Sequence, residues 1–211
     1  DYDALHRWSV EDRAAFWDLV WDFCGVVGDK GDIRLLDGDR MPGARFFPEA
    51  SLNFAENLLR KRGSGDALVF WGEDRVKRRM SWDELAALVS RLQQAMLATG
   101  VTAGDRIAAM MPNLPETIAA MLAAASIGAV WSSCSPDFGP RGVLDRFGQI
   151  EPTIFIACDG YYYGGKVIDI AGKLAEIVPA LPTVRQTVIV PYIGTAEATA
   201  ASLSRAATLD T

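Results

Sequence analysis

The feature that most constrains the fold is a regular alternation of short apolar segments and helix-like segments between residues 107 and 190. Four segments have the length and apolar character of buried strands: Ile107–Met111, Ala129–Ser133, Thr153–Cys158 and Thr187–Val190. Strands that are buried on both faces and joined by helices form a parallel sheet with helices on both sides. The sequence therefore predicts an α/β fold built on a doubly wound, mostly parallel sheet with flanking helices.

Helix signals fill the intervals between these strands. Pro115 and Gly128 bound one expected helix, because proline favours the first helical position and glycine the residue after the last. The residues expected to face the sheet are Ile118, Met121, Leu122 and Ala125. A second helix is expected to begin at Pro140, and a third to cover Lys166–Val178. The Ala-, Thr- and Ser-rich tail after Pro191 fits either a weak helix or a linker.

A β-hairpin and a long helix are expected before this region. Ala67–Trp71 and Val76–Met80 flank a short polar stretch, which is the pattern of a β-hairpin. Ser81 and Glu84 have the spacing of a capping box, so a helix is expected to begin there and to end at Gly100.

The beginning of the chain has the pattern of a helical, loop-rich cap. Ser9 and Asp12 have a capping-box-like spacing at the start of a helix. The apolar residues that follow at helical spacing are Phe16, Trp17, Val20 and Phe23. Aromatic side chains in such a stripe mostly belong to a core rather than to a ligand site, and a short helix is expected around Asn53–Arg60. We therefore divide the chain into a helical N-terminal cap, residues 1–60, and the first, incomplete part of an α/β domain, residues 61–211.

Charge and composition argue against several function classes. The net charge of −6 and the pI near 4.9 disfavour a nucleic-acid-binding surface, because such a surface needs a basic stripe. No run of about 18 uncharged apolar residues is present, so no transmembrane helix and no membrane partner are expected. Residues 1–13 are charged throughout and lack the apolar core of a signal peptide, which favours a cytoplasmic location.

The small number of histidines and cysteines excludes many catalytic arrangements. His6 is the single histidine, so a Ser-His-Asp triad, a Cys-His pair or a multi-histidine metal site would all depend on it. Cys24, Cys134 and Cys158 match neither a disulfide framework nor a zinc spacing, and we expect buried thiols. No phosphate loop, dinucleotide-binding glycine motif, nucleophile elbow or carboxylate set with metal spacing occurs. We therefore expect no catalytic residue and no metal site within this chain.

Two loops are the best candidates for ligand contact, because ligands of open α/β sheets bind beyond the carboxyl ends of the strands. The first is residues 131–139, where hydroxyl side chains end a strand and proline and glycine lead into a helix. Ser135 and Asp137 could either line a ligand site at this helix start or cap the helix, and the sequence leaves both interpretations open.

The second loop is residues 159–166, which combines three tyrosines, a glycine pair and Lys166. The tyrosines offer flat faces for a base, and the glycines allow backbone amides to approach a phosphate. Lys166 adds a positive charge at an expected helix start. This combination favours a nucleotide-diphosphate ligand; the alternative is an exposed loop whose tyrosines pack on neighbouring elements.

Several segments resemble short-chain acyl-CoA synthetases of the adenylate-forming superfamily. The similarity begins at residues 46–59 (FFPEASLNFAENLL) and continues, in the family's order, through 104–116 and 123–128. Residues 131–139 and 142–147 resemble the acetoacetyl-CoA synthetase branch, because the acetyl branch usually has Phe-Gly-Gly-Phe where this chain has Ser-Pro-Asp-Phe. The resemblance covers essentially the whole chain.

This resemblance implies a ligase that activates acetoacetate with ATP to an acyl-adenylate and then transfers the acyl group to coenzyme A. Such enzymes need Mg²⁺, an ATP-phosphate loop that carries a lysine, and a mobile C-terminal domain. These 211 residues contain neither that loop nor the C-terminal lysine. We therefore expect an N-terminal portion of an adenylate-forming enzyme that is inactive alone.

The resemblance also implies roles for particular residues. In the acetyl-CoA relatives, the loop that matches residues 159–166 carries two arginines that meet the nucleotide end of coenzyme A, and their positions fall here on Tyr163 and Lys166. Lys166 keeps a cation for phosphate, whereas Tyr163 can only stack or form a hydrogen bond. The turn at Ser135 and Asp137 matches a wall of the pantetheine tunnel. The expected coenzyme-binding residues are Lys166, Tyr163, Gly165, Ser135 and Asp137.

Three alternatives remain at this point: an acetyl- or propionyl-CoA synthetase, a non-catalytic module that binds coenzyme A or a nucleotide, and a purely structural domain. The acyl pocket of the family is formed largely by later residues, so the acid is inferred from branch resemblance alone. The expected partners are small molecules. Oligomers of the fragment could arise artefactually from an exposed sheet edge or apolar patch.

Overall fold

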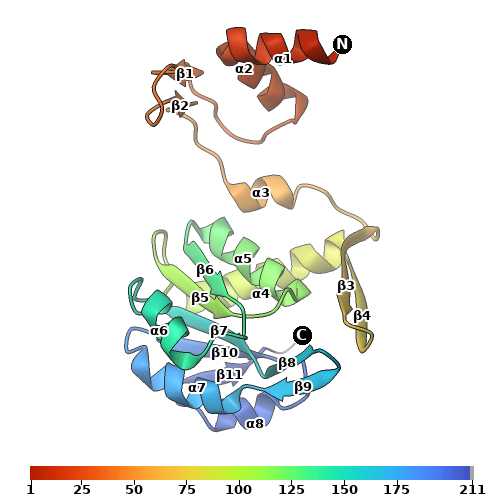
Figure 1. Cartoon of the computed structure of the whole chain (residues 1–211), viewed down its shortest axis with the longest axis vertical. Coiled ribbons are helices and arrows are strands. Elements are labelled where there is room, and N and C mark those ends of the chain that lie inside the picture. The colour runs from red at the N-terminus through yellow and green to blue at the C-terminus, as the bar shows by residue number, and fades with distance from the viewer. Residues whose placement is uncertain (210–211) are drawn as a thin grey trace. The chain divides into compact units, whose positions relative to one another are not determined.

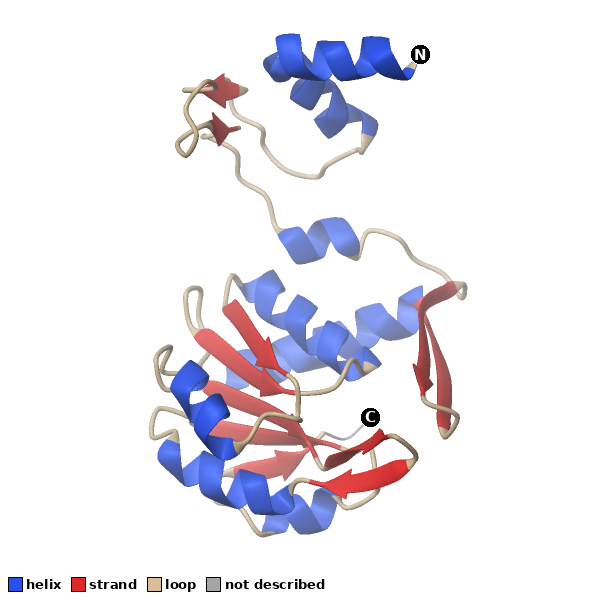
Figure 2. Ribbon diagram, in the orientation of Figure 1, coloured by secondary structure: helices blue, strands red, loops and turns tan. Residues whose placement is uncertain are grey.

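The structure is a computed structural model that describes residues 1–209 (Figure 1). Contacts along the chain divide it into two compact units, Asp1–Leu58 and Leu59–Thr211. The first unit contains three helices and a pair of two-residue strands, and the second contains all the longer strands (Figure 2). Among the described residues, no helix combines the length and the apolar character that crossing a membrane requires.

The first unit begins with two consecutive helices. Its elements are α1 (Tyr2–Glu11), α2 (Arg13–Phe23), β1 (Leu35–Leu36), β2 (Arg45–Phe46) and α3 (Phe54–Leu58). Asp12 caps α2, because its carboxylate accepts a hydrogen bond from the amide of Ala15. The expected cap at Ser9 is wrong. The chain is already helical from Tyr2, so Ser9 lies within α1 and its hydroxyl donates to the carbonyl of His6.

The aromatic stripe of α2 is only partly packed. Trp21 contacts Phe47 with tilted rings whose centroids are 5.0 Å apart, and Phe16 contacts Trp17 edge-on at 5.4 Å. However, no residue of α2 is fully buried, and Phe23 is 88% exposed. The expectation that the stripe forms a core is therefore wrong for Trp17 and Phe23, which are exposed, while Phe16 and Val20 are partly buried.

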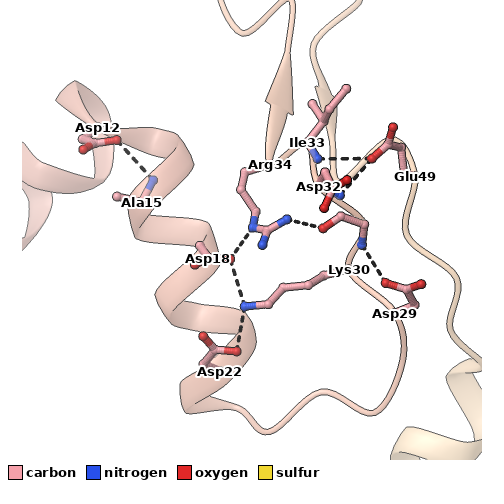
Figure 3. A network of polar contacts seen from close by, with 11 residues as sticks. Asp12, Ala15, Asp18, Asp22, Asp29, Lys30, Asp32, Ile33, Arg34 and Glu49 are labelled. Atoms are coloured by element: carbon pink, nitrogen blue, oxygen red, sulfur yellow. Dashed lines mark hydrogen bonds and ion pairs between the residues drawn. The ribbon is translucent and has the colours of Figure 1, made fainter.

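An ion-pair network joins α2 to the loop that follows it (Figure 3). Asp18 and Asp22 lie one turn apart on α2, and the ammonium of Lys30 donates to both carboxylates, at 2.9 and 2.7 Å. The guanidinium of Arg34 also donates to Asp18. The hydrogen bonds that Asp18 accepts from Lys30 and then from Arg34 lower its pKa. Those that Lys30 donates to Asp22 and then to Asp18 raise the pKa of Lys30.

We expect Asp18→Asn to loosen this unit at neutral pH but not in acid. A folded-state pKa below the ordinary 3.8 means that the carboxylate stabilises the fold above that value and loses this effect as pH falls through the lowered pKa. Amide hydrogen exchange of residues 13–34 should therefore be faster in the variant at pH 7, with a difference that shrinks as the pH falls below 3.8 and through the lowered pKa. Asp39→Asn is the control, because that carboxylate pairs with Arg13 while almost fully exposed. Equal exchange in wild type and Asp18→Asn at pH 7 would contradict the expectation.

The second unit contains a hairpin and a long helix, followed by alternating strands and helices. The elements are β3 (Asp66–Gly72), β4 (Val76–Ser81), α4 (Trp82–Ala98), β5 (Arg106–Met110), α5 (Pro115–Ile127), β6 (Val130–Cys134), α6 (Pro140–Phe147), β7 (Ile154–Cys158), β8 (Gly160–Tyr163), β9 (Lys166–Asp169), α7 (Ala171–Ile177), the 3₁₀ turn η1 (Val178–Ala180), β10 (Gln186–Val190), α8 (Ala196–Ala201) and β11 (Ala206–Thr208). The hairpin β3–β4 and the capping box of Ser81 with Glu84 are confirmed. The tail after Pro191 forms a short helix and an additional strand.

The centre of this unit is a five-stranded parallel sheet in the order β11-β10-β7-β5-β6. The chain moves from β5 to β6 in one direction and then returns past β5 to β7, so right-handed crossovers place α5 and α6 on opposite faces. Figure 2 shows α4 and α5 on one side of the sheet and α6, α7 and α8 on the other. All five residues of β7 are buried. The expected doubly wound α/β fold is confirmed.

Helix α5 turns a face of small residues inward. Its buried positions include Ala119, Ala120, Ala123 and Ala124, together with Leu122. Ile118, Met121 and Ala125, which were expected to face the sheet, are only partly buried, so that assignment is wrong for these three. Small side chains let a helix approach its neighbours closely, which suits the tight packing of α5 against α4.

The segment expected to start a helix at Lys166 forms a β-hairpin instead. Strands β8 and β9 pair antiparallel, and α7 begins only at Ala171. Gly164 and Gly165 form the two-residue turn with φ values of +57° and +75°, the left-handed conformation that such tight hairpin turns require. Lys166 is therefore the first residue of a strand, and it does not lie at a helix start.

A single buried carboxylate organises the loop after β10. Asp159 directly follows β7 and is completely buried. One carboxylate oxygen accepts hydrogen bonds from the amides of Tyr192 and Ile193 at 2.8 and 2.9 Å, and the other from Gly194 and Thr195 at 2.9 and 2.7 Å. These bonds tie the ends of two neighbouring strands together.

We expect Asp159→Asn to destabilise the second unit by about 2–5 kcal/mol. The asparagine amide group would turn two hydrogens toward backbone N–H groups that also need an acceptor, and it would remove the charge that strengthens the four bonds. Urea unfolding measures the loss. Asp145→Asn removes the same charge from an exposed position on α6 and should change stability little. Equal unfolding midpoints for the two variants would refute the role given to Asp159.

Candidate functional site

A cleft of about 490 Å³ lies at the carboxyl ends of the parallel strands of the second unit. Its walls come from the β3–β4 turn, from the loops that follow β5 and β6, from β8, and from Tyr192 in the loop after β10. In doubly wound sheets, ligands bind at this edge, between two parallel strands whose following connections run to opposite faces of the sheet. The cleft brings together the two loops that the sequence singles out, because Ser135, Asp137 and Tyr163 all line it.

The loop after β6 is held by its backbone. Lys173 on α7 donates to the carbonyls of Pro136 and Phe138, at 2.9 and 3.3 Å. The loop that carries Ser135 and Asp137 is therefore anchored at two places, by strand β6 at its start and by α7 through Lys173. No local pattern predicts this role of Lys173, which lies 37 and 35 positions after the two residues it contacts.

The structure excludes one of the two interpretations of this loop, namely that Ser135 or Asp137 caps the following helix. Helix α6 begins after Gly139, and no side chain caps it. The expectation that Ser135 or Asp137 caps the helix is therefore wrong. Asp137 instead lies beside Tyr161 on the neighbouring hairpin. Burial, and then the hydrogen bond and charge of Asp137, raise the pKa of Tyr161, so the phenol stays protonated and donates to the carboxylate.

The β8–β9 hairpin forms the outer wall. Tyr163 and Lys166 are direct cross-strand partners next to the turn, so their side chains project from the same side. Tyr163 lines the cleft and is 68% exposed. Lys166 is exposed, lies beyond the cleft lining, and makes no ion pair with any residue between 1 and 209. The side chain of Lys166 is thus an exposed cation beside the rim of the cleft.

The amides of the glycine pair are engaged. Gly164 and Gly165 donate to the two carboxylate oxygens of Glu73 in the β3–β4 turn, at 2.8 and 3.1 Å. The expectation that these amides receive a phosphate is therefore not met in this structure, because a carboxylate of the same chain takes that position. Sequence reasoning missed Glu73, since its partners lie 91 and 92 positions away and no local pattern points to them.

Aromatic rings form the inner wall. Tyr192 contacts Tyr162 and Phe70 edge-on, with ring centroids 5.0 and 6.0 Å apart. Gly72 at the end of β3 is needed for this packing, because a Cβ there would lie 2.3 Å from the hydroxyl of Tyr192. The sequence did not single out Tyr192, which the buried Asp159 holds through its amide.

The cysteines do not supply a nucleophile in the cleft. Cys134 lines the cleft, and burial raises its pKa to about 11; burial also raises the pKa of Cys158 to about 12. Both thiols are therefore protonated at neutral pH. The expectation of buried thiols holds for these two and is wrong for Cys24, which is exposed. Across residues 1–209, no three His, Cys, Asp or Glu side chains form a group that could hold a metal ion.

Known proteins with similar sequences cover both units. The acetoacetyl-coenzyme A synthetase of Rhizobium meliloti is 63% identical over 99% of this chain, and the acetoacetyl-CoA synthetase of Macaca fascicularis is 37% identical over 93%. The solved structure of acetoacetyl-CoA synthetase from Streptomyces lividans matches 98% of the chain with a TM-score of 0.88 and 40% identity. The chain spans about a third of the length of these relatives, between 30% and 32%.

Two family profiles match in succession. Residues 2–58 match the profile described as acetyl-coenzyme A synthetase N-terminus. Residues 55–208 match the profile described as AMP-binding enzyme, which is most of the chain and includes the whole cleft. Together with the parallel sheet and the strand-end cleft, this match shows that the chain belongs to the AMP-binding enzyme family.

Proposed function

We propose that this chain is the N-terminal portion of an acid–thiol ligase that converts acetoacetate, ATP and coenzyme A to acetoacetyl-CoA, AMP and pyrophosphate. In the first half-reaction a carboxylate oxygen of acetoacetate attacks the α-phosphorus of ATP, and pyrophosphate leaves. In the second, the sulfur of coenzyme A attacks the acyl carbon, and AMP leaves. The names of the relatives support this reaction.

In this proposal the chain supplies part of the coenzyme A surface, and the full-length protein carries the activity. Residues 1–60 form the N-terminal cap and residues 61–211 the first part of the adenylation domain. The 211-residue chain is inactive alone, because the ATP-phosphate loop and the acyl pocket belong to other segments. The substrates and partners are small molecules, and the protein acts in the cytoplasm.

The observation that carries the proposal is the single cleft that Ser135, Asp137 and Tyr163 line together. Ser135 and Asp137 form the wall near the thiol end of coenzyme A, where a hydroxyl and a carboxylate can hydrogen-bond the amides of the pantetheine arm. Tyr163 offers a ring face to the nucleotide base. Lys166, at the rim beside Tyr163, meets a phosphate. Gly165 shapes the turn between them, since its amide is bonded to Glu73.

Mg²⁺ is part of the proposed full-length reaction, where it would neutralise charge on the phosphates of ATP. The described residues do not fit this ion, because they contain no group of three carboxylate, histidine or cysteine side chains that could hold a metal. In the proposal, the residues of this chain bind and orient coenzyme A.

Full-length protein should catalyse pyrophosphate–ATP exchange that depends on acetoacetate. Exchange with acetate or propionate at the same concentration should be much weaker, because the proposal places the protein in the acetoacetate branch. Comparison of kcat/KM for the three acids measures this preference. A clear preference for acetate or propionate would refute the substrate assignment in favour of an acetyl- or propionyl-CoA synthetase. Absence of exchange with every acid would favour a non-catalytic binding module.

Lys166→Ala in the full-length protein should raise the KM for coenzyme A about tenfold, because it removes a hydrogen bond between charged groups. The pyrophosphate exchange reaction does not involve coenzyme A and should keep its rate. Lys166→Arg keeps the cation and should restore most of the affinity. Arg141→Ala, which removes an exposed cation from α6, is the matched control. An unchanged KM for coenzyme A in Lys166→Ala would remove the phosphate contact from the proposal.

A further inference from the structure

The tips of two hairpins, β3–β4 and β8–β9, are joined by a set of polar contacts that we call the hairpin clasp. It consists of Glu73 and Arg75 on one tip and Tyr162, Gly164 and Gly165 on the other. The carboxylate of Glu73 accepts from both glycine amides. The guanidinium of Arg75 donates to the carbonyl of Gly165 at 2.7 Å and lies over the ring of Tyr162, 5.4 Å from its centroid. Both glycine amides and the carbonyl of Gly165 therefore have a partner on the other hairpin.

The β8–β9 hairpin has little else to hold its tip. Its two strands form a separate two-stranded sheet that is not hydrogen-bonded to the central five strands. An isolated two-stranded hairpin is at best marginally stable in water and needs packing against another element. The base of the hairpin is buried through Gly160 and Tyr161, but exposure rises toward Tyr163 and the turn. The clasp, together with the contact of Tyr162 with Tyr192, therefore fixes the outer half of the hairpin, and at the turn itself the contacts come from the clasp.

Glu73 adopts a backbone conformation that a glutamate does not favour. Its φ is +51°, in the left-handed region where glycine and asparagine are preferred. A strained residue persists where its surroundings over-determine it, and such positions are concentrated at ligand sites. The left-handed backbone places the Glu73 carboxylate against the glycine amides. This contact explains why the turn carries a glutamate despite its unfavourable backbone conformation.

The two hairpin residues that are proposed to contact coenzyme A, Tyr163 and Lys166, lie directly beside the clasp. Tyr163 precedes the glycine turn and Lys166 follows it, and neither side chain is otherwise fixed, since both are exposed. Glu73 itself lines the cleft. Any movement of the turn therefore changes where Tyr163 and Lys166 lie relative to Ser135 and Asp137, whose loop is anchored separately by Lys173.

We propose that Glu73 is a positioning residue for coenzyme A binding. It holds the β8–β9 hairpin in the position in which Tyr163 and Lys166 contact the phosphorylated nucleotide end of the coenzyme. This inference rests on the proposed function. Glu73 acts through the hairpin backbone and does not touch the coenzyme. Because it occupies the two glycine amides, phosphate recognition at this rim falls to the side chain of Lys166 rather than to the backbone.

The first measurement is made on the 211-residue chain and does not depend on any ligand. In Glu73→Ala, the amides of Gly164 and Gly165 should exchange with solvent about tenfold faster by NMR, because local opening no longer breaks a carboxylate contact. Glu73→Gln keeps one acceptor oxygen and should show a smaller increase. Asp74→Asn removes the same charge from the neighbouring turn residue, whose exposed carboxylate only pairs with Lys77, and should leave both amides unchanged. Unchanged exchange in Glu73→Ala overturns the proposal.

The second measurement is made on the full-length protein. Glu73→Ala should raise the KM for coenzyme A about tenfold, because only a fraction of hairpins would be in the binding position. The rate of acetoacetate-dependent pyrophosphate exchange should stay at the wild-type value, which also shows that the variant is folded. A general structural defect would lower both activities together, and that result overturns the positioning role.

The two proposals fail in different ways. If Lys166→Ala raises the KM for coenzyme A and Glu73→Ala does not, the positioning role is wrong while the coenzyme surface stands. If neither variant changes that KM, the hairpin does not bind coenzyme A, and both the positioning role and the site assignment are wrong. If both variants raise it and the exchange reaction is retained, the positioning role is supported.

Discussion

The second unit depends on one buried charge, the carboxylate of Asp159. A carboxylate removed from water without partners is strongly destabilising, and four backbone amides compensate for this burial here. The bonds fix the end of β7 relative to the loop after β10, and they hold the backbone of Tyr192. Because Tyr192 supports the inner face of the cleft and β8 begins directly after Asp159, the aromatic wall and the hairpin wall both depend on this residue.

The sequence predicted the parts of the fold that local signals specify. Strands that are apolar on both faces predicted the parallel sheet, and the capping box at Ser81 and Glu84 predicted the start of α4. It also predicted that the loops after β6 and β7 lie near one another, because the carboxyl ends of neighbouring parallel strands meet at one edge of the sheet, and residues of both line the cleft. These inferences need no knowledge of distant contacts, and for this reason they hold.

The predictions that failed depend on competing local signals or on distant partners. The segment from Lys166 was taken for a helix, but two glycines in left-handed conformation between β-favouring residues form a tight turn, and the short run to Asp169 pairs back on β8. The free amides expected at Gly165 are bonded to Glu73, which lies 92 residues away in the sequence. No local pattern in the β3–β4 turn indicates this contact, since a polar turn residue is ordinarily exposed to solvent.

The walls of the cleft differ in how they are held, and this difference bears on recognition. Ser135 and Asp137 belong to a loop fixed through its carbonyls by Lys173, next to the central sheet, so this wall has little freedom to move. Tyr163 and Lys166 lie on a separate two-stranded hairpin whose tip is held by side chains of the β3–β4 turn. In the proposed ligase, the rigid wall faces the end of coenzyme A that must meet the acyl carbon within bonding distance, where small displacements cost the most rate. The hairpin wall faces the nucleotide end, where the positions of Tyr163 and Lys166 depend on the contacts that Glu73 makes with the turn between them.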